Sequence, residues 1–131
     1  MTDKINILCF EDLAEHQQML REIFADRANI KFFDDWDIDD PARVREITQF
    51  KPKFAIVDLL CAKTEDKPGY RVIRKIQETF QLPVVAWSVL FNDSPDGIRA
   101  QSRVEGMGVK PVHKVPGIKP SPDRFLEAAG F

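Results

Sequence analysis

Five polar side chains suited to phosphoryl chemistry lie at or near the ends of apolar runs in this sequence. They are the carboxylates of Glu11, Asp12 and Asp58, the hydroxyl of Ser88 and the ammonium of Lys114. Clustered carboxylates repel one another, so they stay ionised together only beside a cation. Oxygen ligands favour a hard ion such as Mg²⁺. A carboxylate can also attack phosphorus while a metal ion and a lysine neutralise the transferring group, so this set predicts phosphoryl transfer to a carboxylate.

The elements that must position these groups follow from hydrophobic periodicity. Five short apolar runs predict strands at Ile5–Phe10, Ile30–Phe33, Phe54–Leu60, Leu82–Leu90 and Val109–Val112. The first, third and fourth runs are nearly continuous in apolar residues, as in strands that are covered on both faces of a parallel sheet. Helical spacing separates the runs. The order strand–helix, repeated five times, predicts a doubly wound α/β fold, with residues 1–131 forming a single domain.

Three helix starts are marked by a capping side chain that stands before a proline. The pairs are Asp40-Pro41, Ser94-Pro95 and Ser121-Pro122. Proline suits the first helical position because its missing N–H would have no partner there. These starts fix the order of the strands and helices along the chain.

The predicted topology would bring the five polar side chains together. In open α/β sheets, ligands bind at the carboxyl ends of the strands. Taken alone, Asp58 could cap the next loop, and Glu11-Asp12 could cap the first helix. Ser88 alone is more often structural, and Lys114 alone would be a surface lysine. The convergence of all five at one rim favours the functional interpretation.

Four segments resemble the signature regions of response-regulator receiver domains: ILCFED, FAIVDLL, LPVVAWS and VHK. The resemblance spans nearly the whole chain and implies a flavodoxin-like sheet of five parallel strands in the order 2-1-3-4-5. It also implies that Asp58 is the phosphoacceptor, with Ser88 and Lys114 as the hydroxyl and the lysine of the site. The cofactor would be Mg²⁺, bound by Glu11, Asp12, Asp58 and the backbone carbonyl of Leu60.

The resemblance further implies the partners of the chain. A histidine kinase or phosphotransfer protein would donate the phosphoryl group, and an unidentified downstream protein or output domain would receive the signal. A homodimer through the fourth helix, fifth strand and fifth helix is an expectation from the family. The chemistry would be Mg²⁺-dependent self-phosphorylation and dephosphorylation, so we do not expect an enzyme that turns over a separate substrate.

The sequence departs from the family pattern around Lys114. Val115 follows the lysine where the family usually has proline, so we expect this loop to take another path. Pro111 occupies the position of the family's aromatic switch residue, and it has no ring that could move when Ser88 moves. Because proline cannot donate a ladder hydrogen bond, the fifth strand should be an edge strand.

Two smaller departures carry weaker predictions. Val89 follows Ser88 where many family members have a smaller residue, so we expect slow dephosphorylation. The charged insert Lys63–Lys67 could be a partner surface or simply a solvated loop.

Composition excludes several classes of function. The net charge is −2 with mixed signs, so no basic face for direct nucleic-acid binding is expected. No apolar run approaches the roughly 20 residues that cross a bilayer, so we expect no membrane association and a cytoplasmic location. Cys9 and Cys61 fit buried thiols in a reducing compartment.

Aromatic and histidine residues near the site are expected to have structural roles. His16 should lie on the polar side of the first helix and face solvent, and His113 should point to the face opposite Lys114. Trp87 should be in the core. Trp36 is either an exposed anchor for a partner or, as we favour, packed against the second helix.

Three alternative functions would use parts of the same pattern. A degenerate receiver would keep the fold as a phosphorylation-independent interaction module; Pro111 and Val115 favour it, whereas the intact polar set opposes it. A haloacid-dehalogenase-type enzyme needs a second aspartate at the position of Leu60, so that hypothesis fails. A flavodoxin-like cofactor carrier needs a glycine- and hydroxyl-rich phosphate loop after the first strand. The acidic stretch from Glu11 to Glu15 excludes it.

Overall fold

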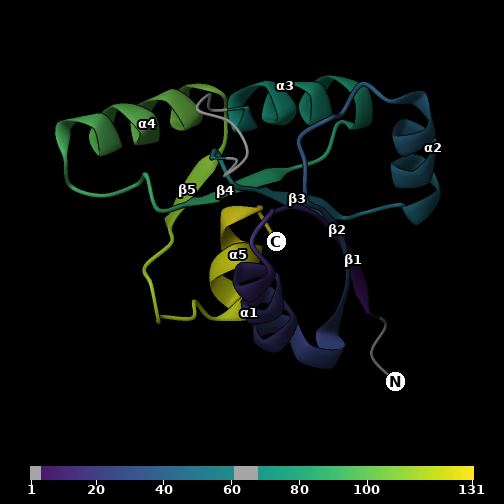
Figure 1. Ribbon diagram of the computed structural model, residues 1–131, viewed down its shortest axis with the longest axis horizontal. Coiled ribbons are helices and arrows are strands. Elements are labelled where there is room, and N and C mark those ends of the chain that lie inside the picture. Colours follow the sequence, from purple (N-terminus) through teal and green to yellow (C-terminus); the bar gives the residue numbers. More distant parts are fainter. Residues whose placement is uncertain (1–3, 61–67) are drawn as a thin grey trace.

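The computed structural model describes residues 4–60 and 68–131, which form one parallel sheet with helices on both faces (Figure 1). The strands, in chain order, are β1 (Ile5–Phe10), β2 (Ala28–Phe33), β3 (Phe54–Val57), β4 (Val84–Ser88) and β5 (Lys110–His113). The helices are α1 (Ala14–Phe24), the short 3₁₀ helix η1 (Ala25–Arg27), α2 (Pro41–Phe50), α3 (Gly69–Phe80), α4 (Pro95–Gly106) and α5 (Pro122–Ala128). The strand order is β2-β1-β3-β4-β5, and every pairing is parallel. The predicted fold class is confirmed.

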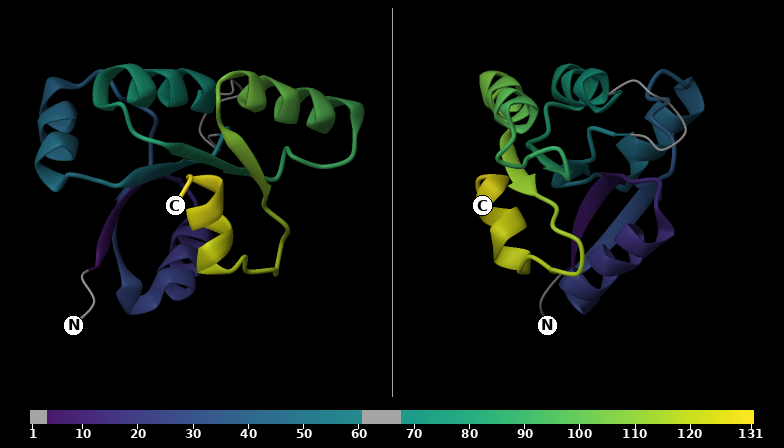
Figure 2. Two further views of the ribbon diagram at one scale, coloured as in Figure 1. Left: turned by 180° about the vertical axis from the view of Figure 1, so that it is seen from behind. Right: turned by 60° about the vertical axis from the view of Figure 1, so that its left-hand side comes forward.

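The helices divide into two layers around the sheet. Helices α2, α3 and α4 cover one face, and α1 and α5 cover the other (Figures 1 and 2). Successive residues of a strand point to opposite faces. In β1, Leu8 and Phe10 therefore join the core under α2–α4, whereas Ile7 and Cys9 join the core under α1 and α5. This double coverage explains the continuous apolar runs in the sequence.

The predicted caps are confirmed for three helices. The side chains of Asp40, Ser94 and Ser121 each accept a hydrogen bond from a backbone N–H two or three positions further along. Helix α1 differs, because its N-cap is Leu13, whose own side chain makes no capping hydrogen bond. The N-cap of α1 therefore lies one residue after the Glu11-Asp12 pair, and the Leu13 N–H donates to Glu11 Oε1 at 3.2 Å.

Strand ends differ from the apolar runs because burial continues where pairing stops. The third run was predicted to extend to Leu60, but β3 ends at Val57. Leu59 is nevertheless fully buried in the core, which explains the longer apolar signal. In contrast, β2 begins at Ala28, before the predicted start, because Ala28 and Asn29 pair with β1. Strand β5 lies at the sheet edge, as the proline within it predicted.

Candidate functional site

Among the described residues, four polar or charged residues are buried, and all four belong to the predicted site. They are Glu11, Asp58, Ser88 and Lys114, with exposed fractions of 1%, 6%, 0% and 2%. Each lies at the carboxyl end of a different strand: β1, β3, β4 and β5. Burial of charge is costly unless the charges are paired, so a cluster of this kind needs an internal balance.

The Lys114 ammonium provides that balance by bridging two carboxylates. Its Nζ donates hydrogen bonds to Glu11 Oε2 at 2.6 Å and to Asp58 Oδ2 at 2.8 Å. Two carboxylates and one ammonium leave a formal charge of −1 in this group. Burial raises the pKa of Glu11, and the Asp58 charge raises it further, while Lys114 acts in the opposite direction. The site therefore favours an additional positive charge.

The same kind of backbone hydrogen bond positions Glu11, Asp58 and Lys114. Each is the first residue after its strand, and its N–H donates to the last carbonyl of a neighbouring strand. Glu11 donates to β2 at 3.0 Å, Asp58 to β1 at 3.1 Å and Lys114 to Ser88 of β4 at 3.0 Å. The sheet ladder thus extends one residue beyond each strand and fixes the backbone from which each functional side chain projects.

The phosphoacceptor candidate is held on several sides. The Asp58 carbonyl accepts a hydrogen bond from the Trp36 indole N–H at 2.9 Å, and its Oδ1 accepts one from the Leu60 N–H at 3.1 Å. The start of α3 packs closely behind it. A Cβ added at Gly69 would lie 2.4 Å from Leu59 Cα and 2.6 Å from the Asp58 carbonyl oxygen, so only glycine fits there.

Ser88 reaches the rim but is not joined to the ionic group. Its Oγ accepts a hydrogen bond from the Leu90 N–H at 3.2 Å, and among the described residues no hydrogen bond joins this hydroxyl to the side chains of Glu11, Asp58 or Lys114. Its hydroxyl is completely buried. Ser88 is thus in the predicted place with a local partner.

The predicted metal ligands fit Mg²⁺ in their donor chemistry. The oxygens of Glu11 and Asp58 are hard donors, and Asp12 directly follows Glu11 and is half-buried. Within residues 4–60 and 68–131, no three Asp, Glu, His or Cys side chains are gathered closely enough to hold a metal. The negative charges of Glu11 and Asp58 are instead paired with the Lys114 ammonium. A divalent cation would have to share the carboxylates with the ammonium.

His16 is a site residue that the sequence interpretation missed. It was predicted to face solvent, but its side chain is only 17% exposed and its Nδ1 lies 3.2 Å from Lys114 Nζ. The same Nδ1 lies 3.5 Å from Glu11 Oε1. The signal was present in the sequence, because His16 precedes the buried Leu20 by four residues and therefore shares its helix face.

Both tryptophans are buried and lie close to the site. Trp87 belongs to the core as predicted, and Lys114 Nζ lies 4.4 Å from the centre of its ring, a cation–π distance. Its Nε1 has no hydrogen-bond partner among the described residues. Trp36 is 6% exposed, so the exposed-anchor alternative is wrong. It shares a core cluster with Ile47 of α2 and also contacts Asp58, which was not foreseen.

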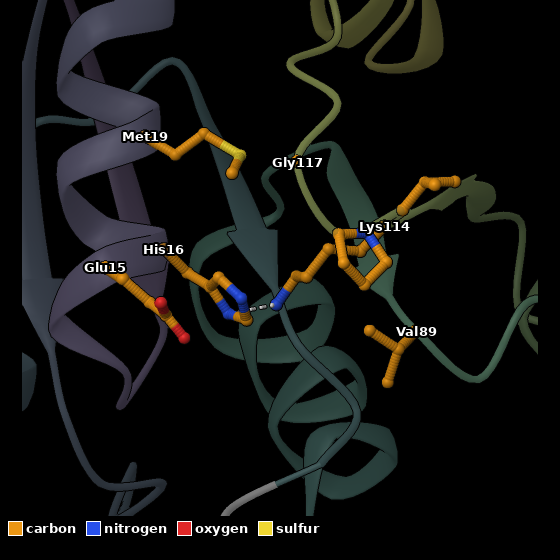
Figure 3. A pocket seen from close by; sticks show the side chains of 8 residues that line it. Glu15, His16, Met19, Val89, Lys114 and Gly117 are labelled. Atoms are coloured by element: carbon orange, nitrogen blue, oxygen red, sulfur yellow. Dashed lines mark hydrogen bonds between the residues drawn. The ribbon is translucent and has the colours of Figure 1, made fainter.

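A cavity of about 120 Å³ lies on the α1 side of the Lys114 ammonium. Glu15, His16 and Met19 of α1 line one side, and Val89 and residues 114–117 line the other. Figure 3 shows the tips of His16 and Lys114 meeting between these two walls. Glu11 and Asp58 do not line this cavity, so it is adjacent to the carboxylate pair rather than part of it.

The departures around Lys114 can also be placed. Pro111 is half-buried on the edge strand β5, and the described residues contain no cis peptide bond, so the Lys114–Val115 bond is trans. His113 is exposed while Lys114 is buried, which confirms that they point to opposite faces. The charged insert Lys63–Lys67 lies outside the described residues.

Several solved structures to which this chain is similar are receiver domains. The signal receiver domain of a modulated diguanylate cyclase from Desulfovibrio desulfuricans G20 matches with a TM-score of 0.68 and 19% identity, over 97% of this chain and 94% of that one. The response regulator domain of Thermotoga maritima CheB matches with a TM-score of 0.65 and 17% identity, over 98% of both chains. The isolated receiver domain of RcsB from Salmonella enterica serovar Typhimurium matches with a TM-score of 0.63 and 16% identity, over 96% and 99%.

This chain therefore has the fold of response-regulator receiver domains, as the four sequence segments predicted. No protein-family model matches the sequence, and no curated protein matches it significantly. Because the identities to these solved structures are below 20%, the likeness shows the fold alone. Among the described helices, none has the length and apolarity needed to span a membrane.

Proposed function

We propose that this chain acts in the cytoplasm as a single receiver domain that accepts a phosphoryl group on Asp58 in a Mg²⁺-dependent reaction. One observation carries the proposal. The buried Lys114 ammonium lies 2.8 Å from Asp58 and 2.6 Å from Glu11, at the strand ends where this fold binds ligands. A buried ion pair contributes little to stability by itself, so its retention at this rim favours a chemical role.

The proposed step is a displacement at phosphorus. An Asp58 carboxylate oxygen forms a new P–O bond, and the bond from phosphorus to the donor breaks, which releases acetate from acetyl phosphate or imidazole from a phosphohistidine. Lys114 offers a compact charge to the phosphoryl oxygens as Asp58 loses its own charge. Hydrolysis reverses the modification, because water forms inorganic phosphate and restores the Asp58 carboxylate.

Glu11, Asp12, Asp58 and the Leu60 carbonyl would hold the Mg²⁺ ion, which when bound neutralises charge on the phosphoryl oxygens. The backbone contacts of Glu11 and Asp58 fix the positions from which both side chains project at one rim. Electrostatic preorganisation of this kind requires little rearrangement during the reaction.

The output of the modification would be a conformational change at Ser88. Its hydroxyl now accepts from Leu90, and a phosphoryl oxygen on Asp58 would offer it a charged acceptor instead. The donor would be a histidine kinase or a phosphotransfer protein, and the response would pass to a downstream protein or output domain. The chain would turn over no substrate other than its own phosphoryl group.

A second candidate is a degenerate receiver that binds partners without phosphorylation. The observation that favours it is Pro111, which provides no ring at the edge strand to follow a movement of Ser88. In this alternative, the Lys114 bridge would be purely structural. The two candidates differ in whether Asp58 reacts.

The test is intact-mass spectrometry after incubation with acetyl phosphate and Mg²⁺. We expect one phosphoryl adduct in the wild-type protein, none after chelation of the metal and none in Asp58→Asn. Asp96→Asn, which alters an exposed aspartate on α4, should retain the adduct. Absence of any adduct with both acetyl phosphate and phosphorylated kinase would reject the proposal in favour of the degenerate receiver.

A further inference from the structure

The Lys114 ammonium has a third partner besides the two carboxylates. A protonated lysine has three N–H donors, and three acceptors surround this one: Glu11 at 2.6 Å, Asp58 at 2.8 Å and His16 Nδ1 at 3.2 Å. We propose that His16 is a positioning residue for Lys114 and fixes the direction of its ammonium from helix α1. This inference rests on the proposed function, because it assigns a role within the same site.

Elementary chemistry determines which group donates and which accepts in the hydrogen bond between Lys114 and His16. An ammonium has no lone pair, so the His16–Lys114 contact is attractive only when Nδ1 is unprotonated and accepts. The imidazole is then neutral, with its proton on Nε2, a tautomer assigned from the hydrogen-bond pattern. The competing contact, from Nδ1 to Glu11 Oε1, is 3.5 Å, at the outer limit for a hydrogen bond. The contact with Lys114 is therefore the stronger of the two.

Contacts within the protein orient the His16 imidazole. His16 lies in the first turn of α1, and its ring centre is 5.9 Å from that of Trp87 with the planes tilted by 60°. Trp87 also contacts the Lys114 ammonium through its ring face at 4.4 Å. Lysine and histidine thus meet beside one buried aromatic surface, at the edge of the cavity in Figure 3. Rigid supporting contacts of this kind hold a functional group in its working geometry.

A neutral acceptor for Lys114 leaves the two carboxylates and the ammonium charge available for the reaction. Both carboxylate partners take part in the proposed reaction, Asp58 as nucleophile and Glu11 toward the metal. His16 takes no part in the bond changes, so it can keep its hydrogen bond to Lys114 when the Asp58 oxygen bonds to phosphorus. Because the imidazole carries no negative charge, it leaves the full ammonium charge available to the phosphoryl oxygens.

The first test compares two substitutions of His16 with a matched control. His16→Leu keeps the bulk but removes the acceptor, and we expect phosphorylation by acetyl phosphate to slow by about fivefold, the net contribution of one typical intramolecular hydrogen bond. His16→Asn retains an acceptor and should recover most of the rate. His113→Leu changes the exposed histidine next to Lys114 and should have no effect.

Ligand affinities give a readout that a general loss of structure would not produce. We expect His16→Leu to weaken binding of the phosphoryl mimic beryllofluoride by about fivefold, measured by tryptophan fluorescence, while Mg²⁺ affinity stays within about twofold. Equal losses for both ligands would contradict a specific effect on Lys114. Identical behaviour of His16→Leu and His16→Asn, or wild-type rates in His16→Leu, would overturn the inference.

A double-mutant cycle separates this inference from the proposed function. Unfolding equilibria of His16→Leu, Lys114→Met and the double variant report their coupling without any phosphoryl donor. We expect a coupling factor of about five in the unfolding constant. Absence of coupling overturns the positioning role even if Asp58 is phosphorylated. Coupling in a protein that no donor phosphorylates supports the contact and rejects the phosphoacceptor role.

Discussion

Two groups of charges in this protein contain similar residues in different environments. The first is the buried trio of Glu11, Asp58 and Lys114, whose side chains are 1%, 8% and 2% exposed. The second lies along the acidic segment 34–40, where Asp35 pairs with Arg43 and Asp39 with Arg71. In the Asp39–Arg71 pair, the side chains are 49% and 62% exposed. The acidic segment has more charges, yet the trio forms the candidate site.

The comparison shows that position in the fold matters more than charge density along the chain. Exposed pairs are screened by water and salt, and their net contribution is small. Buried charges have lost that screening, so each depends on the others and responds strongly when one changes. The β-strand ends create the buried environment because they place polar residues at a rim that the core still covers.

The largest expected effect comes from removing the buried cation. Lys114→Met would leave two buried carboxylates facing each other, and we expect the free energy of unfolding to fall by about 3 kcal/mol in the metal-free protein. Urea denaturation at neutral pH measures the change. Lys110→Met, which removes an exposed lysine from the same strand, is the control and should change stability by less than about 0.5 kcal/mol.

Lys114→Met combined with Asp58→Asn sharpens this result. Replacing one carboxylate relieves the repulsion, so the double variant should regain part of the lost stability. A single Lys114→Met variant as stable as the wild type would show that the buried trio behaves like the exposed pairs.

An intermediate effect is expected where the acidic segment reaches the site. Trp36 lies within that segment, and its indole N–H donates to the Asp58 carbonyl. Trp36→Phe leaves this carbonyl without its buried donor, at a cost of about 1–2 kcal/mol in unfolding free energy on top of the lost packing. Chemical denaturation should detect the loss, and acetyl phosphate should react more slowly because the Asp58 backbone is less fixed. Unchanged stability and rate would mean that the segment is independent of the site.

The smallest effect is expected for the exposed pairs. Arg71→Gln removes one cationic partner of Asp39 and leaves Lys75 at 3.8 Å, and we expect a loss of no more than about 0.5 kcal/mol, which disappears at high salt. Arg74→Gln on the same helix serves as the control for the substitution itself. A salt-independent loss above about 1 kcal/mol would contradict the contrast between the two groups.

The sequence predicted the rim of the site because the signal for it is local. A charged residue at or near the end of an apolar run marks a strand end, and that pattern located Glu11, Asp58 and Lys114. Two other features depend on the path of the chain in space. The contact of Trp36 with Asp58 requires segment 34–40 to fold back over β3, and burial of Leu59 without pairing made the third strand look longer.

His16 is an intermediate case. Its spacing from Leu20 placed it on the buried face of α1, but it is surrounded in sequence by Glu15 and Gln17, which suggested a polar face. The contact with Lys114 could not be derived from spacing, because it joins residues 98 positions apart. Ser88 was predicted at the rim, whereas its local bond to Leu90 depends on how the chain turns after β4.

The most direct test of the central claim is to locate the phosphoryl group chemically. The protein is incubated with acetyl phosphate and Mg²⁺, reduced with borohydride, which converts a phosphorylated aspartate to homoserine, and mapped by peptide mass spectrometry. Modification at Asp58 alone, abolished in Lys114→Met and reduced in His16→Leu, is the predicted result. Modification at another carboxylate, or none at Asp58 in a protein that carries a phosphoryl adduct, would contradict the account.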